Sequence, residues 1–193
     1  MKLTVLIIMA FAVIASSAFA EDSKEQPQLP YYDWGACPFE CCTYREWKAP
    51  DRVKAYADYR DEAAVIFEID KGEWFTALTG VVITYKVGIT KVLKPVEMGY
   101  ANGVKYPAIK AVPGDTLYKL HYLGEGFVLF WYKGKIYSDQ FPPETSPNPP
   151  SAENKIQTIT RPEVGWWVKI KNKKGQIGWI NVLVYFENSD SCS

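Results

Sequence analysis

The sequence contains a single histidine, His121, among 193 residues, which leaves little room for chemistry that depends on imidazole. A metal centre built from several histidines is excluded. A hydrolase of the Cys-His or Ser-His-Asp type would have to use His121 as its general base. The strand expected at 117–123 places His121 on one face with two leucines and a lysine. We therefore expect an ordinary, partly buried structural histidine.

Neither sign of charge predominates, because 22 Lys and Arg residues balance 22 Asp and Glu residues. A nucleic-acid groove needs clustered cations that displace counterions, so we expect no nucleic-acid partner. The one basic cluster, 169–174, is expected to be a solvated hairpin tip, with an anion site as the alternative. Phosphate-binding glycine loops, zincin helices and calcium loops are missing as well, and we expect no cofactor and no metal.

Long apolar runs are missing except at the N-terminus, MKLTVLIIMAFAVIASSAFA. Lys2, the short apolar core and the Ala18-Phe19-Ala20 ending are typical of a cleaved signal peptide, residues 1–20. The run is too short for a comfortable bilayer span, although an N-terminal anchor is the alternative. We expect an exported protein, periplasmic or extracellular, that starts at Glu21 and keeps no stable membrane span after cleavage.

Cysteine is scarce, with four residues, but an oxidising compartment would make disulfides the default. Because a bond between the adjacent Cys41 and Cys42 is strained, two pairings remain. The first joins Cys37 to Cys41 and Cys42 to Cys192, and the second joins Cys37 to Cys42 and Cys41 to Cys192. Zinc binding is the less favoured alternative, because C-x3-C-C with one distant histidine lacks the usual spacing.

Helix-period patterning is almost absent, and the only short helix expected is 52–62. Strict alternation over 81–93 predicts a half-buried strand or a long hairpin broken near Gly88. The residues on its apolar face are Val81, Ile83, Tyr85, Val87, Ile89 and Leu93. Short strands with glycine turns indicate small all-β barrels. Five prolines in 141–150 predict an extended linker or loop.

The C-terminal hairpin, WWVKIKNKKGQIGWI (166–180), resembles the close of a bacterial SH3-like (SH3b) domain. IDKGEWFTALTG (69–80) resembles an earlier strand of that family, and PGDTLYKLHYLGEGFVLFWYKGKIY (113–137) resembles the strands of a second unit. The resemblance implies two SH3-like barrels at 51–110 and 111–186, the second carrying the proline-rich insertion. A leader and disulfide-pinned irregular cap (21–50) would precede them, and a tail (187–193) would follow.

Aromatic residues make up 15% of the chain, more than a small core needs, and Trp and Tyr suit grooves for carbohydrate or peptide. Adjacent strand residues point to opposite faces, so only one of Trp166 and Trp167 can enter a given core. The other is exposed, covered by the cap or placed at a domain junction. The candidate ligand-binding residues lie near the hairpins: Tyr118, Trp131, Tyr132, Trp167 and Trp179.

The family resemblance implies a non-catalytic binding module whose partner is peptidoglycan or an envelope protein. A purely structural envelope protein, whose extra aromatics bury the junction of the two barrels, is the first alternative. A cell-wall hydrolase that uses His121 is the second, because loop acids such as Asp115 and Glu125 are more simply explained as solvated surface groups. The sequence does not indicate the oligomeric state.

Overall fold

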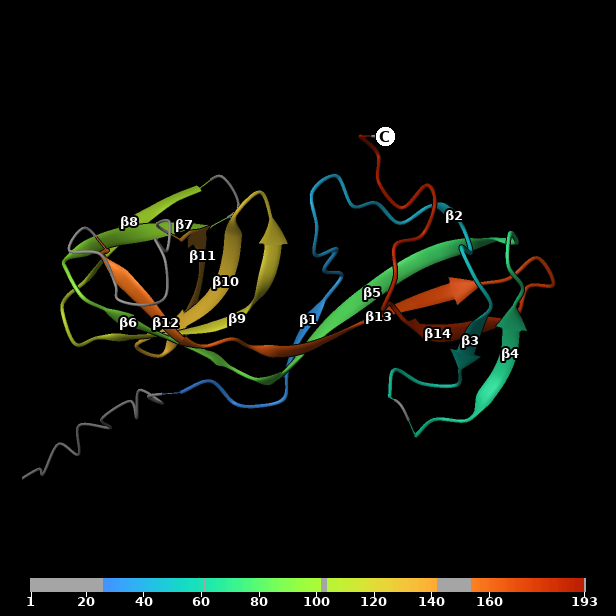
Figure 1. The fold of residues 1–193 in the computed structure, drawn as a ribbon, viewed down its shortest axis with the longest axis horizontal. Helices are drawn as coiled ribbons and strands as arrows, with labels where there is room; N and C mark the ends of the chain where they lie inside the picture. The colour runs from blue at the N-terminus through green and yellow to red at the C-terminus, as the bar shows by residue number, and fades with distance from the viewer. Residues whose placement is uncertain (1–25, 61, 102–103, 142–153, 193) are drawn as a thin grey trace, which may run out of the picture.

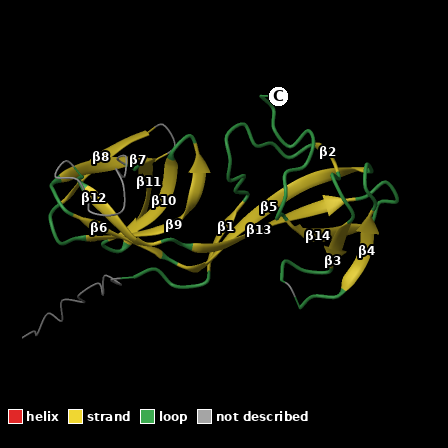
Figure 2. Cartoon of the chain, viewed as in Figure 1, coloured by secondary structure: helices red, strands yellow, loops and turns green. Residues whose placement is uncertain are grey.

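The computed structural model describes residues 26–60, 62–101, 104–141 and 154–192, and these residues form strands and loops (Figures 1 and 2). The expected signal peptide and most of the proline-rich segment lie outside the described residues. The strands are β1 (Tyr31–Trp34), β2 (Glu46–Lys48), β3 (Val53–Tyr56), β4 (Val65–Ile69), β5 (Trp74–Lys86), β6 (Gly88–Val92), β7 (Val96–Ala101), β8 (Val104–Ala111), β9 (Thr116–Gly124), β10 (Phe127–Tyr132), β11 (Lys135–Gln140), β12 (Ile156–Thr160), β13 (Glu163–Lys171) and β14 (Ile177–Asn181).

The strands form two sheets that divide the chain differently from the units expected from sequence. The terminal sheet has the order β1-β5-β13-β14-β3-β4, with β2 also paired to β5, and so combines both ends of the chain. The inserted sheet has the order β12-β6-β9-β10-β11-β7-β8. The expected boundary at 110/111 falls inside β8 of the inserted sheet, and the hairpin at 166–180 belongs to the terminal sheet. The strand pairs of the described residues close neither sheet into a barrel.

A two-stranded ribbon runs through both sheets and joins them (Figure 1). The antiparallel pair β5–β13 in the terminal sheet continues as the pair β6–β12 in the inserted sheet. Where the ribbon passes from one sheet to the other, its two segments approach closely, since a Cβ on Gly88 would lie 2.7 Å from the Cδ of Pro162. Only glycine fits there without a shift of the backbone, and the break between β5 and β6 falls at the preceding residue, Val87.

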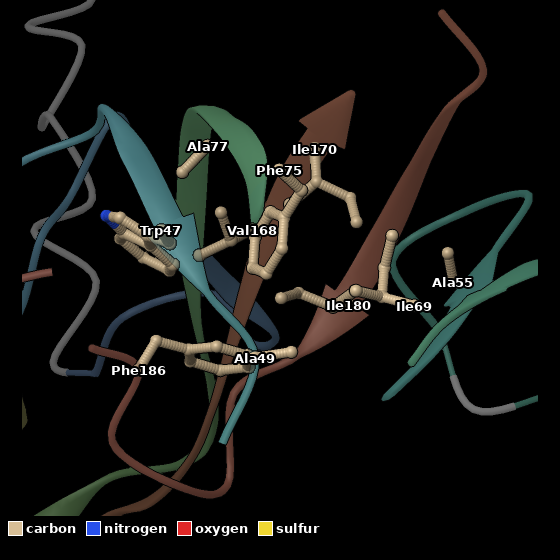
Figure 3. Packing of buried hydrophobic residues seen from close by; sticks show 10 residues of the cluster. All are labelled: Trp47, Ala49, Ala55, Ile69, Phe75, Ala77, Val168, Ile170, Ile180 and Phe186. Carbon is tan, nitrogen blue, oxygen red and sulfur yellow. The ribbon is translucent and has the colours of Figure 1, made fainter. Parts of the chain in front are cut away.

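The main core of the terminal sheet lies between the sheet, the cap and the C-terminal segment, as Figure 3 shows. Trp47 from β2 stacks on Phe186 with ring centroids 5.6 Å apart, and Phe75 meets the edge of the same ring system. The buried members are Trp47, Ala49, Ala55, Ile69, Phe75, Ala77, Val168, Ile170, Ile180 and Phe186. Trp47 and Tyr44 of the cap therefore help to complete this core.

The cap is fastened to the C-terminal segment by a disulfide and by hydrogen bonds. The bonds found are Cys37–Cys42 and Cys41–Cys192, which is the second of the two pairings expected from sequence. Arg45 donates to the carbonyl oxygens of Asn188, at 2.8 Å, and of Asp190, at 2.6 Å. The cap and the C-terminal segment are thus held together over one face of the terminal sheet.

The individual strands agree with the predictions from sequence more closely than the domain boundaries do. The strand expected at 117–123 lies within β9, and the hairpin at 166–180 appears as β13 and β14. The helix expected at 52–62 is wrong, because 53–56 pairs with β4 and β14 as β3. Pairing with two neighbouring strands satisfies the backbone hydrogen bonds of this segment as a helix would, and it also buries Ala55 in the core.

The alternation over 81–93 is correct as a strand signal but wrong about which faces are buried. Val82 and Thr84, on the face expected to be polar, are as buried as Val81 and Ile83. The reason is that this part of β5 has neighbours on both faces. Aromatic side chains around Trp167 cover one face, and Trp166 and β9 cover the other. Beyond Gly88 the ribbon enters the inserted sheet, and the buried side changes to Thr90 and Val92.

Candidate aromatic binding site

One face of the terminal sheet, opposite the main core, gathers aromatic side chains from distant segments. Alternation along each strand sends Tyr32 and Trp34 of β1, Tyr56 of β3, Trp167 of β13 and Trp179 of β14 to this side. Tyr59, from the loop after β3, packs against them. We call this set the aromatic face: Tyr32, Trp34, Tyr56, Tyr59, Trp167 and Trp179.

The rings of the aromatic face pack edge to face. The ring centroids of Trp34 and Tyr59 lie 5.2 Å apart at an interplanar angle of 89°, and those of Tyr59 and Trp179 lie 5.2 Å apart at 69°. Tyr32 lies nearly parallel to Trp34, with centroids 6.2 Å apart. Edge-to-face contacts of this kind contribute about 0.5–1.5 kcal/mol each beyond the buried area. The rings therefore hold one another in place before any ligand binds.

Exposure on the aromatic face increases from its base to its rim. Trp167 is fully buried at the base with Val81 and Ile83. At the rim Trp34 keeps 56% of its surface exposed and Tyr32 keeps 39%. Rigid rings of this size are seldom left in water together without a contact to make, so the rim is the candidate ligand surface.

A cation lies beside the rings. The Nζ atom of Lys169 lies 5.8 Å from the ring centroid of Trp179, within the range of a cation–π interaction. The face thus combines flat apolar surfaces, phenol hydroxyls at their edges and one ammonium group. Such a surface suits a ligand with apolar faces and polar or anionic edges.

Of the candidate residues predicted from the sequence, Trp179 lies on the aromatic face and Trp167 lies at its base. Trp167 is fully buried, so it supports the rings and has no surface for a ligand. The indole of Trp166 instead meets the cap: its Nε1 donates to the hydroxyl of Tyr44 at 3.3 Å, and its ring packs on Phe39. The expected division of the two tryptophans between opposite faces is confirmed.

The other three candidate residues lie on the inserted sheet and form no site with Trp179. Tyr118 and Trp131 face each other across β9 and β10, and both are partly buried. Tyr132 is buried in the inserted core, and its hydroxyl donates to Asp115 at 2.7 Å. Burial alone would raise the pKa of the Asp115 carboxyl, but hydrogen bonds from Val112 N and Tyr132 outweigh it, and the pKa is lowered. The Asp115 carboxylate therefore stabilises the turn in which it lies.

Four residues of the aromatic face were not predicted from the sequence: Tyr32, Trp34, Tyr56 and Tyr59. The segment 31–34 carries a detectable signal, because its aromatic residues alternate with a charged one, as in a strand with an aromatic face. The lack of a sustained period around the three cysteines favours an irregular cap, but 31–34 pairs with β5 as β1. No local pattern marks Tyr59, whose position depends on the fold of its loop over β14.

His121, the one histidine, is fully occupied by structural partners. Its Nε2 atom lies 2.8 Å from the carboxylate of Asp33, and its Nδ1 atom lies 2.9 Å from the carbonyl oxygen of Tyr122. The side chain is buried between β9 and β1. The described cysteines are all in disulfides, so no thiol stands near the imidazole as a nucleophile. This histidine joins the two sheets.

Donor atoms of Cys41, Asp190 and Cys192 lie within 4.8 Å of one another, which is the spacing of a possible metal site. The two cysteines are bonded to each other, and a disulfide offers no thiolate ligand. In this oxidised form, the group is a clasp between the cap and the C-terminal segment.

Comparison of the chain with protein-family models, with curated proteins and with solved structures finds no match. Within the described residues, no helix has the length and hydropathy needed to span a bilayer. Two disulfides are typical of proteins that mature in an oxidising compartment.

Proposed function

We propose that this protein is an exported, non-catalytic binding module that recognises cell-wall glycan through the aromatic face. The observation that carries the proposal is the exposed rim formed by Trp34 and Tyr32, supported from behind by Tyr59 and Trp179. The rings come from three separate segments and converge on one surface. A hydrophobic core would not require the two largest rim rings to remain in water.

Cell-wall sugar suits this surface for chemical reasons. A sugar ring has a flat face of C–H groups that packs on an aromatic ring, and hydroxyls at its edge that hydrogen-bond to tyrosine or water. Acidic groups on wall polymers would meet Lys169. Tyr32 and Trp34 stand two residues apart on β1 and form a row, which favours an extended chain over a single sugar.

The signal peptide and the SH3-like resemblance support the same proposal from the sequence. The disulfides agree with the export that residues 1–20 predict. Two of the segments that resemble an SH3b domain, 69–80 and 166–180, pair with each other in the terminal sheet through β5 and β13. We propose that the terminal sheet is the SH3-like unit and that the inserted sheet interrupts it between these strands.

The test is co-sedimentation of the chain from Glu21 onward with purified peptidoglycan sacculi. Trp34→Ala is expected to weaken binding by at least about tenfold, equivalent to ~1.4 kcal/mol, because it removes the most exposed ring of the rim. Tyr185→Ala is the matched control, since Tyr185 is 58% exposed and lies away from the aromatic face. Moderate salt is expected to reduce binding only slightly, because ring stacking is not screened.

Two results would contradict this proposal. Absence of sedimentation by the unaltered chain would transfer the search to an envelope protein as the partner. Equal binding by the Trp34→Ala and Tyr185→Ala variants would separate wall binding from the aromatic face.

A further inference from the structure

A cavity lies at the far end of the terminal sheet, between two of its turns. One turn, 70–73, joins β4 to β5, and the other, 172–176, joins β13 to β14; both lie at the right of Figure 1. The cavity between them has a volume of about 370 Å³ and is lined mainly by polar atoms. We call it the turn pocket. Its volume is at the lower end of the range for small-ligand sites.

The two walls of the turn pocket carry opposite charges. The β4 side presents Glu68, Asp70 and Glu73. Arg52 approaches the first two, at 3.1 Å from Asp70 and 3.9 Å from Glu68. One guanidinium thus offsets part of the charge of three carboxylates, and the wall stays acidic. The hairpin side presents two lysines, Lys173 and Lys174.

Hydrogen bonds fix both walls. On the basic side, the Asn172 carboxamide oxygen accepts from the backbone nitrogens of Lys174, at 3.0 Å, and Gln176, at 2.9 Å. On the acidic side, the backbone nitrogen of Asp70 donates to the Glu73 carboxylate at 2.8 Å. A site whose turns are already ordered loses little conformational entropy when a ligand binds.

An aromatic ring completes the lining. Trp74 is 37% exposed, and the Nζ atom of Lys48 lies 5.8 Å from its ring centroid. The ring offers a flat apolar surface between the charged walls. A ligand that fits all three features has a cationic end, an anionic end and a short apolar middle.

We propose that the turn pocket binds a small zwitterion: a free amino acid or a short peptide with both ends unblocked. The ammonium group would lie toward Glu68 and Asp70, and the carboxylate toward Lys173 and Lys174. The backbone between them would rest against Trp74. This site is separate from the aromatic face and does not depend on the function proposed for it.

The test is titration of the ¹⁵N-labelled chain with the unblocked dipeptide Ala-Ala, followed by amide NMR shifts. We expect saturable, millimolar binding that shifts the amides of 70–74 and 172–176. The N-acetylated, C-amidated dipeptide has the same apolar middle without charges, and it is expected to cause no such shifts. The spectra also report whether each variant is folded.

Matched double variants separate the pocket from the general charge of the protein. Lys173→Ala with Lys174→Ala is expected to weaken dipeptide binding at least fivefold. Lys110→Ala with Lys171→Ala removes the same charge from exposed positions outside the pocket, and it is expected to leave the affinity unchanged. Absence of saturation with the unaltered chain would overturn the proposal. Equal binding of the blocked dipeptide, or equal loss in both double variants, would also overturn it.

Discussion

Tyr44 shows how one side chain couples the cap to the sheet. Its hydroxyl donates to the carbonyl oxygen of Ala36 and accepts from Trp166 Nε1. Burial raises its pKa to about 12; the Trp166 hydrogen bond partly opposes this, and the nearby Asp33 charge adds to it. The phenol therefore stays protonated at pH values where an exposed tyrosine ionises, near 10.

This shift predicts a loss of stability in alkaline solution. The folded state holds the phenol proton more tightly than the unfolded chain does. The stabilisation is therefore fully present below about pH 10 and is lost as the pH rises through about 12. Phenolate absorbance should show a late-titrating component near pH 12 that Tyr44→Phe removes. Tyr185→Phe, at an exposed position, should leave it in place. A late component unchanged by Tyr44→Phe would contradict the assignment.

Sequence patterns predicted residue roles only where a local rule applied. The division of Trp166 and Trp167 between two faces follows from strand geometry, and it is confirmed. Which of the two would be exposed depended on the neighbours of each face. The cap covers Trp166 and the rings of the aromatic face cover Trp167, so neither forms the exposed rim.

At the scale of elements, β5 shows why a correct strand signal gave an incorrect buried face. The period-two pattern of 81–93 marks an extended chain with a break near Gly88, as observed in β5 and β6. A single polar face was expected because a strand in one small sheet usually has a solvated side. This ribbon passes between two units, so Val82 and Thr84 are covered as well.

The two disulfides predict unequal losses of stability. Cys41–Cys192 closes a loop with a sequence separation of 151, whereas Cys37–Cys42 spans only 5. In the chain-entropy model, the long loop stabilises the fold by about 5 kcal/mol and the short loop by about 2 kcal/mol. Paired Cys→Ser variants, compared by urea denaturation, should show the larger loss for Cys41 and Cys192. Equal losses would mean that the Cys41–Cys192 disulfide does not stabilise the fold by restricting the unfolded chain.

At the scale of the whole molecule, the topology explains what the sequence could not provide. The terminal sheet pairs β5 with β13 across the entire inserted sheet, and the aromatic face joins Trp34 to Trp179. A division of the sequence into contiguous units groups the hairpin at 166–180 with the strands that directly precede it. The local strand and turn signals were sufficient for the elements but carried no information about this long-range pairing.

The contact between the two sheets depends on more than the ribbon. Asp33 of β1 meets His121 of β9, and the Thr84 hydroxyl donates to the carbonyl oxygen of Leu120 at 3.1 Å. The His121 side chain is 1% exposed, so removal of Asp33 would leave a buried ring nitrogen without its acceptor. Each single alanine variant of the pair should reduce the free energy of unfolding by about 1–3 kcal/mol.

A double-mutant cycle tests whether this pair joins the sheets. We expect Asp33→Ala and His121→Ala to be non-additive by about 1–2 kcal/mol, because either change alone already breaks the contact. The ion pair Lys86–Glu163 is the control: it lies at the same junction, but its side chains are 75% and 58% exposed. Its coupling should stay below about 1 kcal/mol, since water screens it. If the Asp33–His121 coupling is no larger than this control, the ribbon and the packing around it hold the two sheets together without the buried pair.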